Sequence, residues 1–218
     1  FKMSKLSPDS IQQDQMWMQF ALAEAETAIY RTRPNPAVGC VIVKDHQIVG
    51  RGATAPVGGS HAEVFALKQA GDQAQGATAY VTLEPCAHYG RTPPCANGLV
   101  EAGISRVVIA CSDPNPLVAG KGVQILKNAG IEVLQGVCEA QAAAQNRGFL
   151  KAIATGMPYV RLKVASSLDG RTAMASGESK WITGTEARQD VQHWRAISGV
   201  VITGIETVLA DDCQLNVR

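Results

Sequence analysis

Apolar positions near the start of the chain recur every three or four residues. Between residues 14 and 32 this spacing places Met16 and Phe20 on one face, which is typical of an amphipathic helix. Asp14 precedes the first apolar position and is the expected N-cap, because its short carboxylate can accept a hydrogen bond from the free N–H groups of a first turn. The polar residues 1–13 are expected to be flexible.

Short apolar runs follow this helix and alternate with further helical patterns. The segment Arg33-Pro34-Asn35-Pro36 ends the helix, because proline cannot continue one and favours an extended predecessor. The expected strands cover residues 37–43, 47–52, 78–83, 106–111 and 131–135. The expected helices cover residues 61–73, 95 to a stop at Gly103, 121–128 and 139–155. This alternation predicts an α/β fold, a three-layer α/β/α domain around a mixed sheet.

A second region is predicted to begin at the segment Gly156-Met157-Pro158. The pattern beyond it predicts a strand at residues 159–165, a helix at about 186–197 and a strand at 200–203. We therefore expect residues 14–156 to form a first domain and residues 157–218 to form the opening part of a second α/β domain. Two strands are too few to complete a second sheet.

Composition narrows the classes of partner. The chain has 218 residues, 46% of them hydrophobic, and a net charge of +1, so it lacks the broad positive field with which proteins bind nucleic acid. Its apolar runs are far shorter than the ~20 residues of a transmembrane helix, and no secretory signal pattern opens it. The 6 cysteines do not suggest a disulfide framework. We expect a cytoplasmic enzyme that binds neither nucleic acid nor a membrane.

The residues with the most specific chemistry lie between His61 and Cys95. His61, Cys86 and Cys95 offer one imidazole and two thiolates, a zinc ligand set that leaves the fourth tetrahedral position open, as in catalytic sites. Glu63 lies two residues after His61, and residues two apart on a helix point in different directions. We expect Glu63 to lie beside the metal-bound water and to transfer protons. The H-x-E and P-C pattern is the known signature of zinc base deaminases.

A structural zinc site is the main alternative interpretation. His88, two residues past Cys86, is the only local candidate for a fourth protein ligand. That arrangement would leave Glu63 without a chemical purpose. A histidine at a helix start or a lone cysteine is usually structural, so the prediction of a catalytic site depends on the combination.

The spacing of the two cysteines is unusual. Eight residues separate Cys86 from Cys95, whereas the deaminase signature has two. The longer segment presents His88 and Arg91, an imidazole and a guanidinium suited to a phosphate at the rim of a pocket. A solvated basic loop is the other interpretation of the same residues.

The motifs together resemble a known family. The segments PNPAVG, HAEVFAL, TLEPCAHYGRTPPC and DPNPLVAGKG, then LKVASSLDGRTA, SKWITG and TVLADDCQLNVR, are similar to the bifunctional deaminase–reductase of riboflavin biosynthesis. This resemblance implies a cytidine-deaminase-like first domain that binds Zn2+ and deaminates a diaminopyrimidinone bearing a phosphoribosylamino group. It also implies the start of a dihydrofolate-reductase-like domain that uses NADPH to reduce the ribose to a ribityl chain. A homo-oligomer is expected.

The resemblance also implies roles for single residues. Asn35 matches an asparagine that grips the pyrimidine edge, and His88 and Arg91 match positions that hold the ribose phosphate. The positions that match NADPH contacts are Ala165, Trp181, Thr207 and Asp211. The positions that match contacts of the reductase substrate are Ser179, Arg195, Leu215 and Arg218. No G-x-G-x-x-G fingerprint follows a strand, so the residues alone would not have named a cofactor.

Three positions depart from the family pattern: Phe65 and Thr54 stand where histidines are common, and Cys213 where a proline is common. None of them is among the expected metal ligands. Two other functions stay open at this point. A nucleoside or nucleic-acid base deaminase of the same zinc superfamily would show the short cysteine spacing. A non-catalytic zinc module for protein interaction would bind the metal and release no ammonia.

Overall fold

The computed structural model describes residues 8–87, 94–115 and 118–218. Contacts between Cα atoms divide the chain into two compact units, one ending at Tyr159 and one running from Val160 to Arg218. Each unit is described by itself below. No helix in the described ranges is long and apolar enough to cross a membrane.

The first unit is built on a five-stranded sheet with the order β2-β1-β3-β4-β5. Its strands are β1 (Gly39–Lys44), β2 (Gln47–Ala53), β3 (Thr78–Leu83), β4 (Arg106–Cys111) and β5 (Glu132–Gln135). Strand β1 is antiparallel to both β2 and β3, whereas β3, β4 and β5 are parallel. The mixed sheet predicted from the alternation of elements is therefore confirmed.

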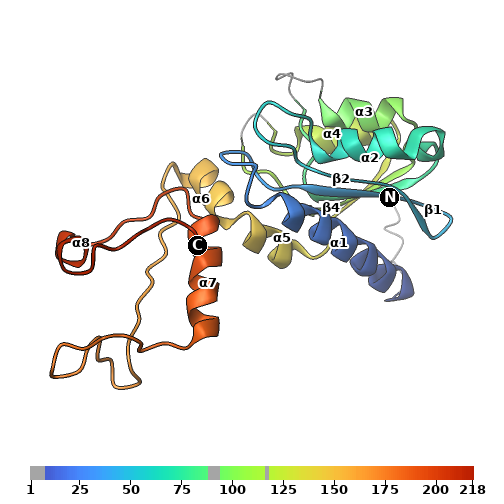
Figure 1. The fold of residues 1–218 in the computed structure, drawn as a ribbon. Helices are drawn as coiled ribbons and strands as arrows, with labels where there is room; N and C mark the ends of the chain where they lie inside the picture. Colours follow the sequence, from blue (N-terminus) through green and yellow to red (C-terminus); the bar gives the residue numbers. More distant parts are fainter. Residues whose placement is uncertain (1–7, 88–93, 116–117) are drawn as a thin grey trace. The chain divides into compact units, whose positions relative to one another are not determined.

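Helices cover both faces of this sheet (Figure 1). The helices of the first unit are α1 (Pro8–Ala28), α2 (Ala62–Ala70), α3 (Cys95–Glu101), α4 (Lys121–Asn128), α5 (Glu139–Gln145) and α6 (Arg147–Thr155), with a short 3-10 turn at Gly71–Ala74. Helices α2, α3 and α4 lie on one face, and α1 and α5 lie on the other. The predicted three-layer α/β/α arrangement is confirmed.

The central strands are buried on both faces because both carry helices, so they have apolar side chains in succession instead of an alternating pattern. The backbone of helix α1 packs directly against Gly39 at the start of β1. A Cβ atom at Gly39 would lie 1.9 Å from the carbonyl oxygen of Ala21, so only glycine allows this contact.

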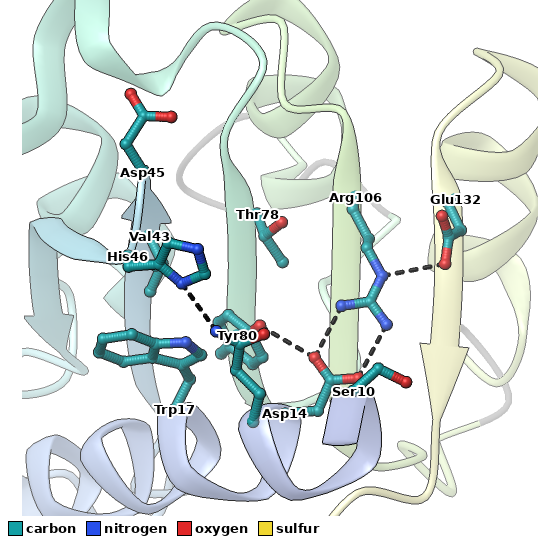
Figure 2. A pocket seen from close by; sticks show the side chains of 11 residues that line it. Ser10, Asp14, Trp17, Val43, Asp45, His46, Thr78, Tyr80, Arg106 and Glu132 are labelled. Carbon is teal, nitrogen blue, oxygen red and sulfur yellow. Dashed lines mark hydrogen bonds and ion pairs between the residues drawn. The ribbon is translucent and has the colours of Figure 1, made fainter. Parts of the chain in front are cut away.

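Asp14 is not the cap that the sequence suggested, because α1 begins at Pro8 and Asp14 lies within it (Figure 2). The Arg106 guanidinium donates to both Asp14 carboxylate oxygens at 2.7 and 2.8 Å, and the Tyr80 hydroxyl donates to one of them at 2.9 Å. Arg106 also pairs with Glu132 at 2.9 Å. The hydrogen bond to Asp14 raises the pKa of Arg106, and burial followed by the Asp14 charge raises the pKa of Tyr80.

This network joins α1 to β3, β4 and β5. It lies at the opposite end of the sheet from the end of β3 that leads to Cys86. Its polar groups are bound to one another, so the hollow that they line is a structural junction between elements (Figure 2).

The helix predicted over residues 139–155 is two helices, α5 and α6, that meet at Asn146. The helix predicted over residues 61–73 is α2 followed by the 3-10 turn.

The second unit contains α7 (Thr185–Ala196) and α8 (Ile205–Asp211). The helix predicted at about 186–197 is confirmed as α7, whereas α8 was not predicted. The strands predicted at 159–165 and 200–203 are wrong, because neither segment pairs with another in the described residues. Side chains in both segments, such as Leu162 and Ile202, are exposed. A segment rich in apolar residues forms a strand only where a neighbouring strand can pair with its backbone.

Candidate metal centre

His61, Cys86 and Cys95 meet at one end of the sheet, although each comes from a different element. His61 is the N-cap of α2, Cys86 follows the end of β3, and Cys95 is the first residue of α3. Their ligand atoms all lie within 4.8 Å of one another. His61 Nδ1 is 3.2 Å from Cys95 Sγ and 3.6 Å from Cys86 Sγ.

These separations fit a zinc ion. Tetrahedral zinc with bonds of about 2.0–2.3 Å holds neighbouring ligand atoms roughly 3.3–3.8 Å apart. In the described residues, this is the one group of at least three histidine, cysteine or acidic side chains with ligand atoms so close together. His88, the fourth ligand of the structural-zinc alternative, lies outside the described residues, as does Arg91.

Hydrogen bonds among His61, Cys86 and Cys95 shift the pKa values of all three side chains. Hydrogen bonds with Cys95 and His61 lower the pKa of the Cys86 thiol to about 4, and the backbone N–H of Cys95 also donates to Cys86 Sγ at 3.3 Å. The hydrogen bond to Cys86 and burial raise the pKa of the Cys95 thiol, so Cys95 keeps the shared proton. The hydrogen bond to Cys86 also raises the pKa of His61. A thiolate held in this way favours a divalent cation, which would displace the remaining protons.

Glu63 lies in the first turn of α2 and is only 4% exposed. Burial raises the pKa of its carboxyl group to about 7, while its backbone hydrogen bond acts in the opposite direction. It is not part of the ligand group, yet its carboxylate interacts with the Cys95 thiol. A carboxyl group with a pKa near 7 can accept and return a proton at neutral pH, which is what the predicted proton-transfer role requires.

Asn35 is exposed in the turn before β1. Because β1 is antiparallel to β3, the start of β1 lies beside the end of β3, and the Gly39 N–H donates to the Thr82 hydroxyl at 3.1 Å. The turn is therefore at the same edge of the sheet as the metal ligands. Thr54, one of the departures from the family pattern, is buried and bound to the backbone of Val38.

The predicted residues of the second unit are only partly brought together. Arg195 on α7 donates to the carbonyls of Gln214 and Asn216 at 3.1 and 3.0 Å, on either side of Leu215. The Arg218 N–H donates to Gln192 on the same helix at 3.0 Å. The other predicted positions of this unit are Ala165, Ser179, Trp181, Thr207 and Asp211, and among the described residues no hydrogen bond or ion pair joins them to Arg195. Trp181 is 72% exposed and packs against Arg188.

Glu84 was not singled out from the sequence, although it precedes Pro85 and Cys86. Its buried carboxylate accepts hydrogen bonds from the N–H groups of Gly120 and Val123 at 3.1 and 3.3 Å. A Cβ atom at Gly122 would lie 2.0 Å from the Pro85 carbonyl oxygen. The start of α4 is thus packed against the segment that delivers Cys86. An acidic residue at the end of an apolar strand was the signal that could have identified it.

Two family models match the chain. The model of the cytidine and deoxycytidylate deaminase zinc-binding region matches residues 11–111. The model of the RibD C-terminal domain matches residues 158–218.

Two curated relatives are longer proteins that share one name. Riboflavin biosynthesis protein RibD of Haemophilus influenzae is 60% identical over 206 residues, which cover 94% of this chain and 55% of that protein. The Escherichia coli protein of the same name is 56% identical over 206 residues, covering 94% of this chain and 56% of its own length. The chain therefore spans about half the length of the curated relatives that it matches.

Solved structures have the same fold. One form of Acinetobacter baumannii RibD matches with a TM-score of 0.88 and 74% identity, over 96% of this chain and 58% of that chain. A Thermotoga maritima diaminohydroxyphosphoribosylaminopyrimidine deaminase/5-amino-6-(5-phosphoribosylamino)uracil reductase matches with a TM-score of 0.90 and 42% identity, over 96% and 60% of the two chains. The α/β fold is therefore cytidine-deaminase-like, as predicted.

Proposed function

This chain belongs to the RibD family of riboflavin biosynthesis proteins, and on this basis we propose that it carries a zinc-dependent deaminase over residues 14–156. Residues 157–218 are proposed to be the start of the NADPH-dependent reductase domain. The observation that carries the deaminase proposal is the convergence of one imidazole and two thiol groups beside a buried carboxyl group.

The proposed reaction is the hydrolytic deamination of 2,5-diamino-6-(5-phosphoribosylamino)pyrimidin-4(3H)-one to 5-amino-6-(5-phosphoribosylamino)uracil. The substrate class follows from the name of the Thermotoga relative. His61, Cys86 and Cys95 would hold the zinc ion. When bound, zinc supplies the Lewis acidity that makes water a nucleophile at neutral pH.

Glu63 would move the protons of this reaction. Its carboxylate accepts a proton from the attacking water. The resulting carboxylic acid then donates that proton to the exocyclic amino group of the ring, which leaves as ammonia. The position of Glu63 supports this role, because its buried carboxyl group lies in the first turn of α2, two residues after His61, and is not part of the ligand group.

The remaining residues of the deaminase would bind the substrate. The Asn35 amide can donate and accept at once, which suits the edge of a pyrimidine ring. His88 and Arg91 are proposed to hold the ribose phosphate, since a guanidinium binds phosphate oxygens in pairs.

The reductase proposal concerns a protein of the length of the curated relatives, of which this chain spans about half. In the second unit, Trp181 is exposed, and the Arg195 guanidinium donates to the backbone carbonyls of Gln214 and Asn216. NADPH binding at Ala165, Trp181, Thr207 and Asp211 and substrate binding at Ser179, Arg195, Leu215 and Arg218 therefore stay predictions. The protein is also proposed to be a homo-oligomer. The reduced thiols of the site suit the cytoplasm, where disulfides are rare.

Incubation of the zinc-loaded chain with the aminopyrimidine tests the deaminase proposal. Mass spectrometry should show the loss of an amino group and the gain of an oxygen atom, with one ammonia released for each product molecule. Cytidine and transfer RNA serve as competing substrates. Turnover of either one in preference to the aminopyrimidine would contradict the proposed substrate, and zinc binding without turnover of any of the three would favour a non-catalytic zinc module.

A further inference from the structure

Asn146 makes two hydrogen bonds to the backbone of one distant residue. Its side-chain oxygen accepts a hydrogen bond from the Ala37 N–H at 2.8 Å, and its side-chain NH2 donates to the Ala37 carbonyl at 2.8 Å. Both residues are buried. The amide therefore pairs with Ala37 as a neighbouring strand would, and it satisfies two backbone groups that are shielded from water.

The two residues after Ala37 are held by other buried side chains. The Val38 N–H donates to the Thr54 hydroxyl at 3.0 Å, and the Gly39 N–H donates to the Thr82 hydroxyl at 3.1 Å. Thr82 belongs to β3, and Thr54 directly follows β2. Unlike Thr54 and Thr82, Asn146 lies outside the sheet, at the junction of α5 and α6.

Asn35 is two residues before Ala37, so the position of Ala37 constrains where the Asn35 side chain can reach. The Asn35 N–H donates to the Thr32 carbonyl at 2.9 Å, which closes the turn on its other side. This turn lies at the edge of the sheet where β3 delivers Cys86.

We propose that Asn146 is a positioning residue of the deaminase site, which fixes the turn that carries Asn35 by binding both backbone groups of Ala37. The inference rests on the proposed deaminase function and on the proposed contact between Asn35 and the pyrimidine. Asparagine is suited to this position because its amide both donates and accepts, whereas aspartate cannot donate to the Ala37 carbonyl. Loss of the side chain leaves two buried backbone groups without partners.

A double-mutant cycle tests whether Asn146 acts through Asn35. The cycle compares the zinc-loaded wild-type chain with the Asn35→Ala, Asn146→Ala and double variants. Asn146→Ala alone should lower kcat/KM for the aminopyrimidine by about tenfold or more, mainly by raising KM, with zinc content unchanged. In the Asn35→Ala background, Asn146→Ala should lower kcat/KM by less than about twofold. An equal loss in both backgrounds would overturn the inference.

Gln145→Ala is the matched control. Gln145 lies at the same junction and donates to the Leu22 carbonyl of α1 at 3.1 Å, whereas the side-chain hydrogen bonds to the Ala37 backbone come from Asn146. Its loss should leave kcat/KM within about twofold of the wild type, because the turn is not touched. If Gln145→Ala has the same effect as Asn146→Ala, a general loosening of the α5–α6 junction is the cause and the inference is wrong.

Hydrogen exchange gives a measurement that does not depend on turnover. In Asn146→Ala the backbone amide hydrogens of Asn35 and of residues 37–39 should exchange about tenfold faster or more than in the wild type, and in Gln145→Ala they should not. Unchanged exchange in Asn146→Ala overturns the inference even if the enzyme is active. A wild-type chain that deaminates no aminopyrimidine refutes the proposed function instead, and it removes the site that Asn146 was proposed to position.

Discussion

Single residues decide the chemistry at the end of β3. Cys86 and Cys95 have identical side chains, yet the pKa of Cys86 is lowered and that of Cys95 is raised, because the Cys95 thiol donates to the Cys86 thiolate. Glu63 is separated from His61 by one residue on α2, and its burial gives it a pKa of about 7. The pKa of each of these side chains is thus set by its hydrogen bonds and its burial as well as by its residue type.

Glu63→Gln should keep zinc and lose turnover. The amide has nearly the same shape as the carboxyl group but cannot accept and return a proton, so kcat should fall by about 100-fold or more. Metal content by atomic emission and ammonia release by a coupled assay measure the two properties separately. A variant with near-normal kcat would exclude Glu63 as the proton carrier.

Asp14→Ala should destabilise the first unit by about 3 kcal/mol, because it leaves the partly buried Arg106 guanidinium and the Tyr80 hydroxyl without their common partner. Urea denaturation followed by circular dichroism gives this difference. Replacement of Asp9, an exposed acid in the first turn of the same helix, is the control and should change stability by less than about 0.5 kcal/mol.

The elements show which parts of the fold follow from local sequence. All five strands of the first unit were predicted to within a few residues, because buried runs between glycine and proline turns are local signals. The role of Asp14 and the break at Asn146 could not be predicted, because each depends on partners far along the chain, Arg106 and Ala37. The group of His61, Cys86 and Cys95 was identified because the motif has a known chemistry, whereas the proximity of these side chains cannot be calculated from the sequence.

Gly122→Ala should disturb the metal centre from a neighbouring element. The new methyl group would lie 2.0 Å from the Pro85 carbonyl, so α4 or the segment leading to Cys86 must shift. We expect zinc affinity to fall by about tenfold or more, since misplaced ligands bind a metal poorly. Competition with a chromophoric chelator measures this affinity. Gly148→Ala is the control, because a methyl group on α6 meets no atom within 4 Å, and it should leave zinc affinity unchanged.

At the scale of the whole molecule, the two units differ in how much apolar surface they bury. The sheet of the first unit is covered on both faces, whereas large apolar side chains of the second unit are exposed, among them Val160, Leu162, Leu168 and Ile202. Segments with few buried contacts open at low free-energy cost.

Limited trypsin digestion of the 218-residue chain should therefore cut first within the second unit, at sites such as Arg161, Lys163 and Arg171. The remaining fragment should keep its zinc, because all three ligands lie before residue 160. Mass spectrometry of the early fragments identifies the sites. Early cleavage within α2 or one of the strands of the first unit would contradict this expectation.

The three metal ligands come from elements that are distant in sequence, with His61 25 residues before Cys86 and Cys86 9 residues before Cys95. An ion held by all three is a reversible cross-link that closes two loops of the polypeptide, so mass action couples the melting temperature to the free zinc concentration. Each tenfold rise in free zinc above the dissociation constant should add about 1.4 kcal/mol of stability, measurable by calorimetry in zinc buffers. His61→Ala should abolish this dependence, whereas His46→Ala, a change in the β1–β2 turn, should retain it. The melting temperature of the protein would then rise and fall with the concentration of free zinc around it.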